Sequence, residues 1–186
     1  MESVLLAHPP LQRQSCRAKS LATLDLSDNA IGSVGVVAVA EAIKQSSFLT
    51  TLVLNECALD CNGAIALAEA IKQSRAITAV ILMSNPIGDK GAVALAESVK
   101  QSKLLHTVDL SGNEIGDIGA IAIAEAIKQS TSLTSVNLGF NNISDVGVSA
   151  IAEAIAHSKS LTTADLGYNP SGDKGATAIA TALTRR

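Results

Sequence analysis

The heptapeptide AEAIKQS occurs at residues 40–46, 68–74 and 124–130, and the near-copy AESVKQS occurs at residues 96–102. The copies therefore recur in steps of 28 residues. A fixed period of this length is typical of chains built from stacked units, each of which buries its apolar face only against a neighbouring unit. The period thus predicts an elongated array of like units rather than one compact core.

The first half of each unit has the spacing L-x-x-L-x-L-x-x-N. Apolar residues two apart predict a short strand with one buried face. The second half changes period, because Ala64, Leu67, Ala68 and Ile71 fall on one helical stripe. The last apolar column of the strand half and the asparagine column read Leu26, Leu54, Leu82, Leu110, Leu138 and Leu166, then Asn29, Cys57, Asn85, Asn113, Asn141 and Asn169.

Strand, loop, helix and loop therefore recur, and all the strands must run parallel. A glycine column, from Gly35 to Gly175 in steps of 28, is expected in the passage from loop to helix. An alanine column, from Ala38 to Ala178 in the same steps, is expected to let neighbouring helices approach closely. We predict helices at residues 35–46, 63–74, 91–102, 119–130, 147–158 and 175–184.

Six consecutive units with this spacing resemble the leucine-rich repeat family, whose pattern is L-x-x-L-x-L-x-x-N/C-x-L, and the period and helical half resemble its ribonuclease-inhibitor-like subclass. The resemblance implies an α/β solenoid, a right-handed horseshoe arc with a parallel sheet on the concave side and helices on the convex side. Residues 1–19 would then be an N-terminal segment with a degenerate capping helix. The repeats would span residues 20–47, 48–75, 76–103, 104–131, 132–159 and 160–186. Decay of the columns at Ala164, Ser171, Thr181 and Thr184 is typical of a terminal repeat, and a partial array of a longer protein stays open as the alternative.

Composition excludes several classes of function. The net charge is −3 with both signs interspersed, so no basic stripe points to nucleic acid or to an anionic membrane surface. No apolar run approaches the roughly 18–20 residues that span a bilayer. Three cysteines, Cys16, Cys57 and Cys61, fit a reduced cytosol better than a disulfide scaffold. We therefore expect a cytoplasmic protein, with Cys57 structural because it replaces one asparagine of the column.

Residues with catalytic chemistry do not form a recognisable set. His8, His106 and His157 lie in unrelated registers and make no metal-ligand spacing with the cysteines. The stretch DLSGNEIGD at residues 109–117 lacks the order and the terminal glutamate of a calcium loop, and the repeat already explains it. We expect no catalytic residue, no metal and no cofactor.

Candidate binding residues are the strand and strand-end positions that point away from the core, because these columns depart from repetition. An apolar patch is expected between acidic positions, and two of the three aromatic residues share one column in adjacent repeats. Exposed aromatic residues are typical binding anchors, whereas local packing of both rings over the strand edge is the alternative. The candidate partner-binding residues are Asp25, Val53, Ile81, Met83, Asp109, Asn137, Phe140, Asp165 and Tyr168.

The resemblance implies a non-enzymatic module that binds a protein partner on its concave face and at its C-terminal loop edge. Repeats of this kind occur in ribonuclease inhibitors, NOD-like receptors, tropomodulins and bacterial effectors. A bacterial effector translocated into the host cytosol, with actin or another abundant host cytosolic protein as its partner, is one form of this hypothesis. A regulator of a small GTPase, similar to a GTPase-activating repeat array, is the alternative, and the repeat portion of an enzyme is a third hypothesis.

Overall fold

The structure is a computed structural model that describes residues 20–184. Six strand–helix units follow one another along the chain. The strands are β1 (Thr23–Asp25), β2 (Thr51–Val53), β3 (Ala79–Ile81), β4 (Thr107–Asp109), β5 (Ser135–Asn137) and β6 (Thr163–Asp165). The helices are α1 (Gly32–Gln45), α2 (Cys61–Gln73), α3 (Gly88–Gln101), α4 (Asp117–Gln129), α5 (Asp145–His157) and α6 (Asp173–Thr184).

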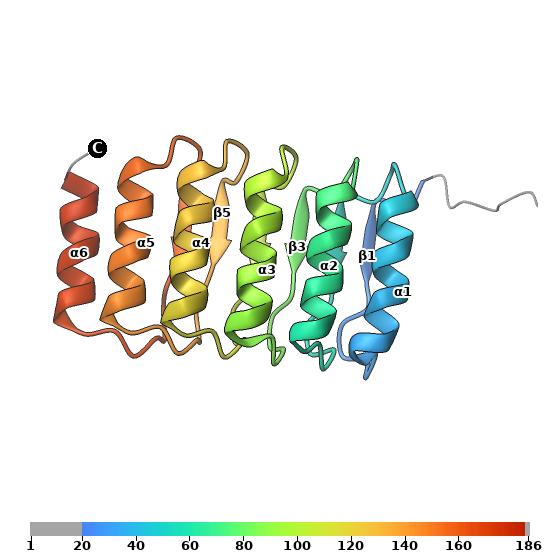
Figure 1. Ribbon diagram of the computed structural model, residues 1–186, viewed down its shortest axis with the longest axis horizontal. Helices are drawn as coiled ribbons and strands as arrows, with labels where there is room; N and C mark the ends of the chain where they lie inside the picture. The colour runs from blue at the N-terminus through green and yellow to red at the C-terminus, as the bar shows by residue number, and fades with distance from the viewer. Residues whose placement is uncertain (1–19, 185–186) are drawn as a thin grey trace, which may run out of the picture.

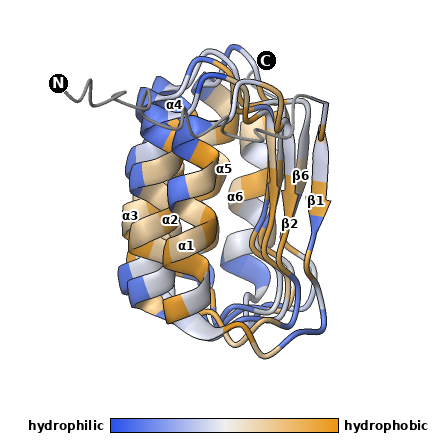
Figure 2. Ribbon diagram, turned by 90° about the vertical axis from the view of Figure 1, so that its right-hand side faces the viewer, coloured by the Kyte–Doolittle hydropathy of each residue, from blue (hydrophilic) through white to orange (hydrophobic). Residues whose placement is uncertain are grey.

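The strands form one parallel sheet in the order β1-β2-β3-β4-β5-β6, and each strand residue pairs with the residue 28 positions later. The sheet is one layer and the helices are the other, with consecutive units stacked side by side (Figures 1 and 2). Adjacent strands lie roughly 4.8 Å apart whereas packed helices need roughly 8–10 Å, so the sheet takes the concave side. The predicted α/β solenoid is confirmed.

The core lies between the two layers and is almost entirely aliphatic. Leu54, Leu82, Leu110 and Leu138 of the third strand column are fully buried. Their counterparts in the end units, Leu26 and Leu166, are only partly buried. Burial therefore depends on having a neighbouring unit on both sides, as expected of a one-dimensional stack.

The helices begin two or three residues earlier than the sequence pattern predicts, and the glycine column lies inside their first turns. The glycines therefore lie just past the passage from loop to helix, and a Cβ at these positions would clash, as expected. A Cβ at Gly119 would lie 2.9 Å from the Cβ of Ala92 in the preceding helix and 2.7 Å from Cγ2 of Ile115. Glycine is required here because neighbouring helices approach each other at this point.

A second set of alanines is buried more deeply than the column that the sequence predicts to bring the helices together. Ala38 is exposed, and Ala66, Ala94, Ala122 and Ala150 are only partly buried. The alanines that face the glycines of the next helix are instead Ala64, Ala92 and Ala120, which are completely buried. Close helix packing is therefore a contact between a glycine of one unit and an alanine of the unit before it.

Aspartates at the starts of α3, α4 and α5 tie these helices to the next unit. Oδ1 of Asp117 accepts hydrogen bonds from the backbone N–H groups of Ser144 and Gly147, both at 2.9 Å. Asp89 and Asp145 make the equivalent pairs of bonds to their following units. The hydroxyl of Ser144 also donates to Asp117 at 2.7 Å, and together these bonds hold the pKa of Asp117 below its usual value.

The capping helix expected within residues 1–19 lies outside the described residues. Among residues 20–184, no helix has both the length and the apolar character that crossing a bilayer requires.

Candidate protein-binding face

The register of the sheet brings the candidate residues of the central column into one row. Val53 pairs with Ile81, and Ile81 pairs with Asp109. Val53 and Ile81 are partly buried, and Met83 is 38% exposed. An apolar patch on β2 and β3 therefore lies between Asp25 on β1 and Asp109 on β4, as the sequence predicts.

The acidic side chains of this row are held by neighbouring donors. Oδ1 of Asp109 accepts the backbone N–H and the hydroxyl of Ser111, and its Oδ2 accepts Nδ2 of Asn137 at 3.0 Å. Asp25 is exposed, and the backbone N–H of Ser27 holds the pKa of this carboxyl below its usual value. Asp165 accepts the backbone N–H of Gly167 at 2.8 Å in the same way.

The sheet and the loops that follow its strands contain acidic residues but no basic residue. No Lys, Arg or His occurs in residues 23–31, 51–60, 79–87, 107–116, 135–144 or 163–172. The net charge of the whole chain is only −3, so this surface is more acidic than the rest of the molecule. The acidic residues in these segments are Asp25, Asp28, Glu56, Asp60, Asp109, Glu114 and Asp165.

Phe140 and Tyr168 stack on each other at the edge where the strands end. Their ring centroids are 4.1 Å apart and their planes differ by 10°. Phe140 is nevertheless 61% exposed and Tyr168 is 80% exposed. The rings thus contact each other, and most of their surface stays open to a partner.

The backbone at this column is left-handed in every repeat. The φ angles lie between 53° and 65° at Asp28, Glu56, Ser84, Gly112, Phe140 and Tyr168. A non-glycine residue in this region costs on the order of 1 kcal/mol, more readily tolerated by Asp or Asn than by a bulky ring. All six repeats share this conformation, so it belongs to the repeat itself, and in two repeats the position carries an exposed ring. In the sequence, the one glycine of this column, Gly112, is the residue that indicates a left-handed backbone.

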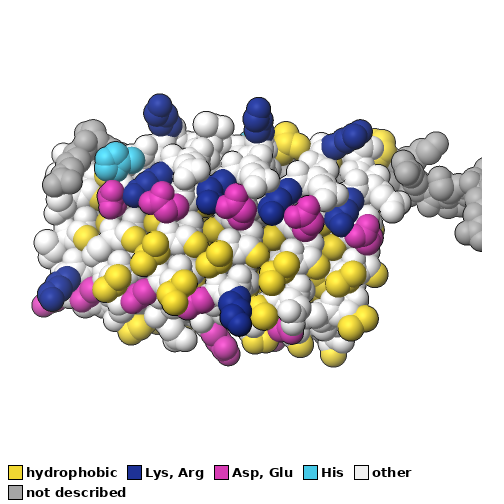
Figure 3. Space-filling model, in the orientation of Figure 1, with side chains coloured by type: hydrophobic (Ala, Val, Ile, Leu, Met, Phe, Trp, Pro, Cys, Tyr) yellow, Lys and Arg dark blue, Asp and Glu magenta, His cyan; other side chains and the backbone are white. Residues whose placement is uncertain are grey.

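A second exposed apolar surface lies on the helices, and it is not among the surfaces that the sequence predicts. Val37, Ile65, Val93 and Ile121 occupy one column on four neighbouring helices and are 42–48% exposed. Figure 3 shows hydrophobic side chains as a band across the helix side of the molecule. The signal was a β-branched residue at the same place in four consecutive helices, where a solvent-facing position usually carries a polar residue.

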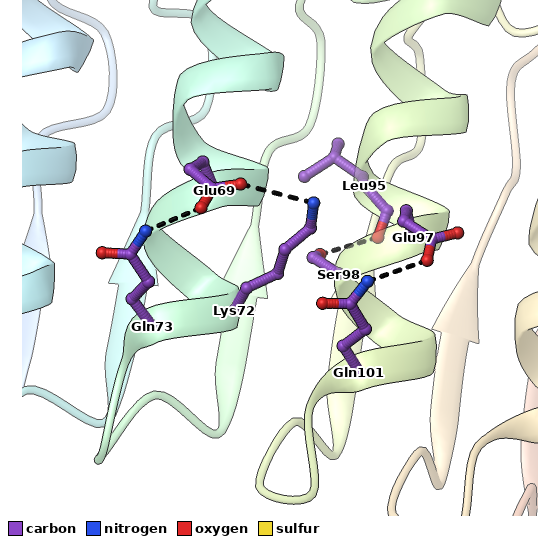
Figure 4. Close-up of polar contacts among 7 residues, drawn as sticks. All are labelled: Glu69, Lys72, Gln73, Leu95, Glu97, Ser98 and Gln101. Atoms are coloured by element: carbon purple, nitrogen blue, oxygen red, sulfur yellow. Dashed lines mark hydrogen bonds and ion pairs between the residues drawn. The ribbon is translucent and has the colours of Figure 1, made fainter.

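Paired charges lie next to this band. Lys72 and Glu69 form an ion pair at 3.4 Å, and Lys100 and Glu97 form one at 2.6 Å. Gln73 donates to Glu69 at 2.6 Å, so these groups satisfy one another within each helix (Figure 4). The predicted outward orientation of the Glu and Lys columns is confirmed. Ser98, which replaces alanine in the near-copy AESVKQS, is buried and donates to the carbonyl of Leu95 at 2.7 Å.

Two cysteines lie in the second unit, Cys57 in the asparagine column and Cys61 after it. Cys57 is fully buried, and its Sγ donates to the carbonyls of Leu26 and Asn55 as the column's asparagines do with Nδ2. Burial raises the pKa of the Cys57 thiol, which supports the structural role predicted for it. Cys61 is the first residue of α2. Within residues 20–184, no three His, Cys, Asp or Glu side chains are grouped to hold a metal ion.

Comparisons with known proteins agree with the repeat architecture. The family model described as "Leucine Rich repeat" matches residues 18–40, 45–68, 73–96, 101–124 and 129–152. A solved structure described as leiomodin-1 actin-binding site 2 is similar, with a TM-score of 0.59 and 23% identity, covering 67% of this chain and 73% of that chain. The tropomodulin C-terminal domain of Caenorhabditis elegans has a TM-score of 0.58 and 15% identity, covering 91% of this chain and 86% of that chain. These identities show the fold alone, and no curated protein sequence matches the chain.

Proposed function

Because this chain belongs to the leucine-rich repeat family, we propose that it is a protein-binding module whose partner docks on the concave sheet and on the adjoining loop edge. The single observation that supports this site is the combination of an acidic face without any basic residue and an exposed, stacked aromatic pair at its C-terminal end. Aromatic anchors supply binding energy, and uncompensated charge steers an oppositely charged partner. The partner surface is therefore basic.

The helix side is the competing surface, and its charges favour it less. Its apolar band is bordered by glutamates that are already paired with lysines of the same helix. Those pairs leave little uncompensated charge to select a partner. On the sheet, the apolar patch of Val53, Ile81 and Met83 lies between carboxylates that no lysine or arginine of that surface neutralises.

A cytosolic protein is the partner class within this proposal, and actin is the first candidate to test. The leiomodin-1 structure is named for an actin-binding site, and its likeness to this chain supports actin only as a starting point. An effector that acts on a host cytosolic protein is the finer form of the same proposal. Co-sedimentation of the purified chain with actin filaments, and gel filtration with actin monomers, test this candidate directly.

The general proposal is tested by capture from a cytosolic extract with three immobilised proteins. These are the unchanged chain, the double variant Phe140→Ala/Tyr168→Ala, and the matched outer-surface variant Ile65→Ser/Val93→Ser. Proteins captured by the first and third but not by the second are then identified by mass spectrometry and purified for affinity measurement. A partner retained by the aromatic variant and lost by the outer-surface variant would place the site on the helices and overturn the proposal.

A further inference from the structure

In the column that contains Phe140 and Tyr168, the position one repeat earlier is Gly112, which has no side chain to extend the stack of rings. Gly112, Phe140 and Tyr168 follow one another in consecutive repeats with φ angles of 65°, 55° and 55°. Gly112 donates its N–H to Gly139 at 3.0 Å, just as Phe140 donates to Gly167 at 2.9 Å. The spacing from Gly112 to Phe140 is thus the same kind of step that puts the two rings 4.1 Å apart.

Tyr168 covers one face of the Phe140 ring. Because position 112 is glycine, no side chain of that repeat covers the other face. The far border of this place is Ser84, since a Cβ at Gly112 would lie 3.3 Å from Oγ of Ser84. On the strand side, the residues that precede the two rings are Gly139 and Gly167, which carry no side chain. The exposed Phe140 ring and Ser84 therefore flank Gly112, a position without a side chain, and we call this place between Phe140 and Ser84 the slot.

The charge of the surrounding surface determines which planar groups can bind in this slot. The strands and loops around it contain no basic side chain; Asp109 lies in the same repeat as Gly112, and Asp165 lies two repeats further on, in the repeat of Tyr168. Oδ1 of Asp165 accepts one N–H, whereas its Oδ2 accepts no hydrogen bond from any described residue. Phosphate-bearing ligands such as nucleotides are repelled by such a surface. A planar cation is attracted to it.

We propose that the slot between Phe140 and Ser84 binds the guanidinium group of an arginine on the partner protein. A guanidinium is planar, stays charged at every physiological pH, stacks on aromatic faces and donates to carboxylates in a fixed fork. A lysine ammonium is attracted by the same carboxylates but cannot stack as a flat group. This inference rests on the proposed function and specifies the chemistry of the partner at one point of its surface.

Two peptides test the inference on the full chain. They have equal length and charge, contain glycine and serine, and differ only in carrying arginines or lysines. Titration into the 15N-labelled protein, followed by amide chemical shifts, should show the arginine peptide perturbing Gly112, Phe140 and Tyr168. Its affinity should exceed that of the lysine peptide by about two- to fivefold, the effect of a cation–π contact at an exposed site. Equal affinities, or shifts elsewhere on the molecule, overturn the assignment.

Gly112→Asn blocks the slot without removing either ring. Five other positions of this column hold side chains at the same left-handed φ, and asparagine tolerates that region, so the variant should fold. We expect Gly112→Asn to abolish the preference for arginine and to leave the weaker, salt-sensitive binding of both peptides. Asp165→Asn should weaken both peptides together. An arginine preference that survives in Gly112→Asn contradicts the slot.

Failure of this inference can be told apart from failure of the proposed function. If arginine is not preferred, but the purified partner still loses affinity when both rings are replaced, the concave site stands and the guanidinium assignment is wrong. If partner affinity depends on Ile65 and Val93 instead, the proposed function is wrong whatever the peptides show.

Discussion

Oδ1 of Asn141 accepts the backbone N–H of Asn113 at 2.9 Å, so the asparagine of one repeat holds the loop of the repeat before it. The same oxygen accepts the N–H of Ile115 at 2.9 Å. Oδ1 of Asn113 is buried and has no partner, because the N–H of Ile87 donates to the carbonyl of Asn85 within its own loop. The loop of the first repeat makes the same bond, from the N–H of Ile31 to the carbonyl of Asn29 at 2.7 Å, and there the column carries Cys57, which has no amide oxygen.

Asn113→Cys should therefore be tolerated much better than Asn141→Cys. A thiol at position 113 can donate to the carbonyls that Nδ2 serves now, as Cys57 does, and it abandons no N–H. Asn141→Cys leaves the buried N–H groups of Asn113 and Ile115 without an acceptor, and each unpaired group costs roughly 1–3 kcal/mol. Urea unfolding under reducing conditions should show Asn141→Cys to be less stable than Asn113→Cys by at least about 2 kcal/mol. Equal losses would mean that the amide oxygen has no special role in the column.

Asp117 should make stability depend on pH in the acid range. Its pKa is lowered in the folded chain by the Ser144 hydroxyl first, and then by the N–H groups of Ser144 and Gly147. These bonds therefore raise the free energy of unfolding fully at pH values above the usual carboxyl pKa of about 3.9. The stabilisation is lost as the pH falls through the lower pKa that Asp117 has in the folded chain. Asp117→Ala should lower stability at neutral pH by about 1–2 kcal/mol and flatten the acid dependence.

Asp173→Ala is the matched control for Asp117→Ala. Asp173 occupies the same column in the last unit, and no following unit lies beside it in the described part of the chain. Denaturant melts at neutral and acid pH should show a much smaller loss for Asp173→Ala. If the two variants behave alike, the bond from one unit to the next contributes nothing measurable.

Ala92→Leu should wedge neighbouring helices apart. Ala92 is fully buried, and its Cβ would lie 2.9 Å from a Cβ at Gly119, so no space exists for a larger side chain. Overpacking of this kind costs about 1–3 kcal/mol. Ala94→Leu should cost less, since Ala94 is only partly buried, and Lys100→Ala should change stability by no more than about 0.5 kcal/mol. If thermal or urea melts show Ala94→Leu to be more destabilising than Ala92→Leu, the packing described for the glycine column is wrong.

Phe140→Ala/Tyr168→Ala should weaken partner binding at least about tenfold, or roughly 1.4 kcal/mol, once a partner is purified. The rings supply rigid contact area and are largely exposed, so the melting transition should change little. Charge reversal at Glu69 and Glu97 on the helix side should leave the affinity intact. The opposite pattern, measured by titration calorimetry, would move the site to the outer surface.

The period, the parallel order of the strands and the inward column that includes Leu82 all follow from the order of the amino acids. It also placed the patch of Val53 and Ile81 between Asp25 and Asp109, because a 28-residue repeat makes position i the neighbour of position i+28. In a stack of like units, each unit meets the same partner, so a local pattern is enough to specify which columns are adjacent.

The three-dimensional structure, in contrast, sets which atoms of neighbouring columns come into contact. It added the close contact of Gly119 with Ala92, left Oδ1 of Asn113 without a donor, and stacked Phe140 on Tyr168 beside Gly112. These outcomes depend on a few tenths of an ångström, on hydrogen bonds within single loops and on the phase of each helix about its axis. A periodic pattern of apolar residues fixes which units touch, but the atoms that meet across the contact are set by the three-dimensional packing of both units.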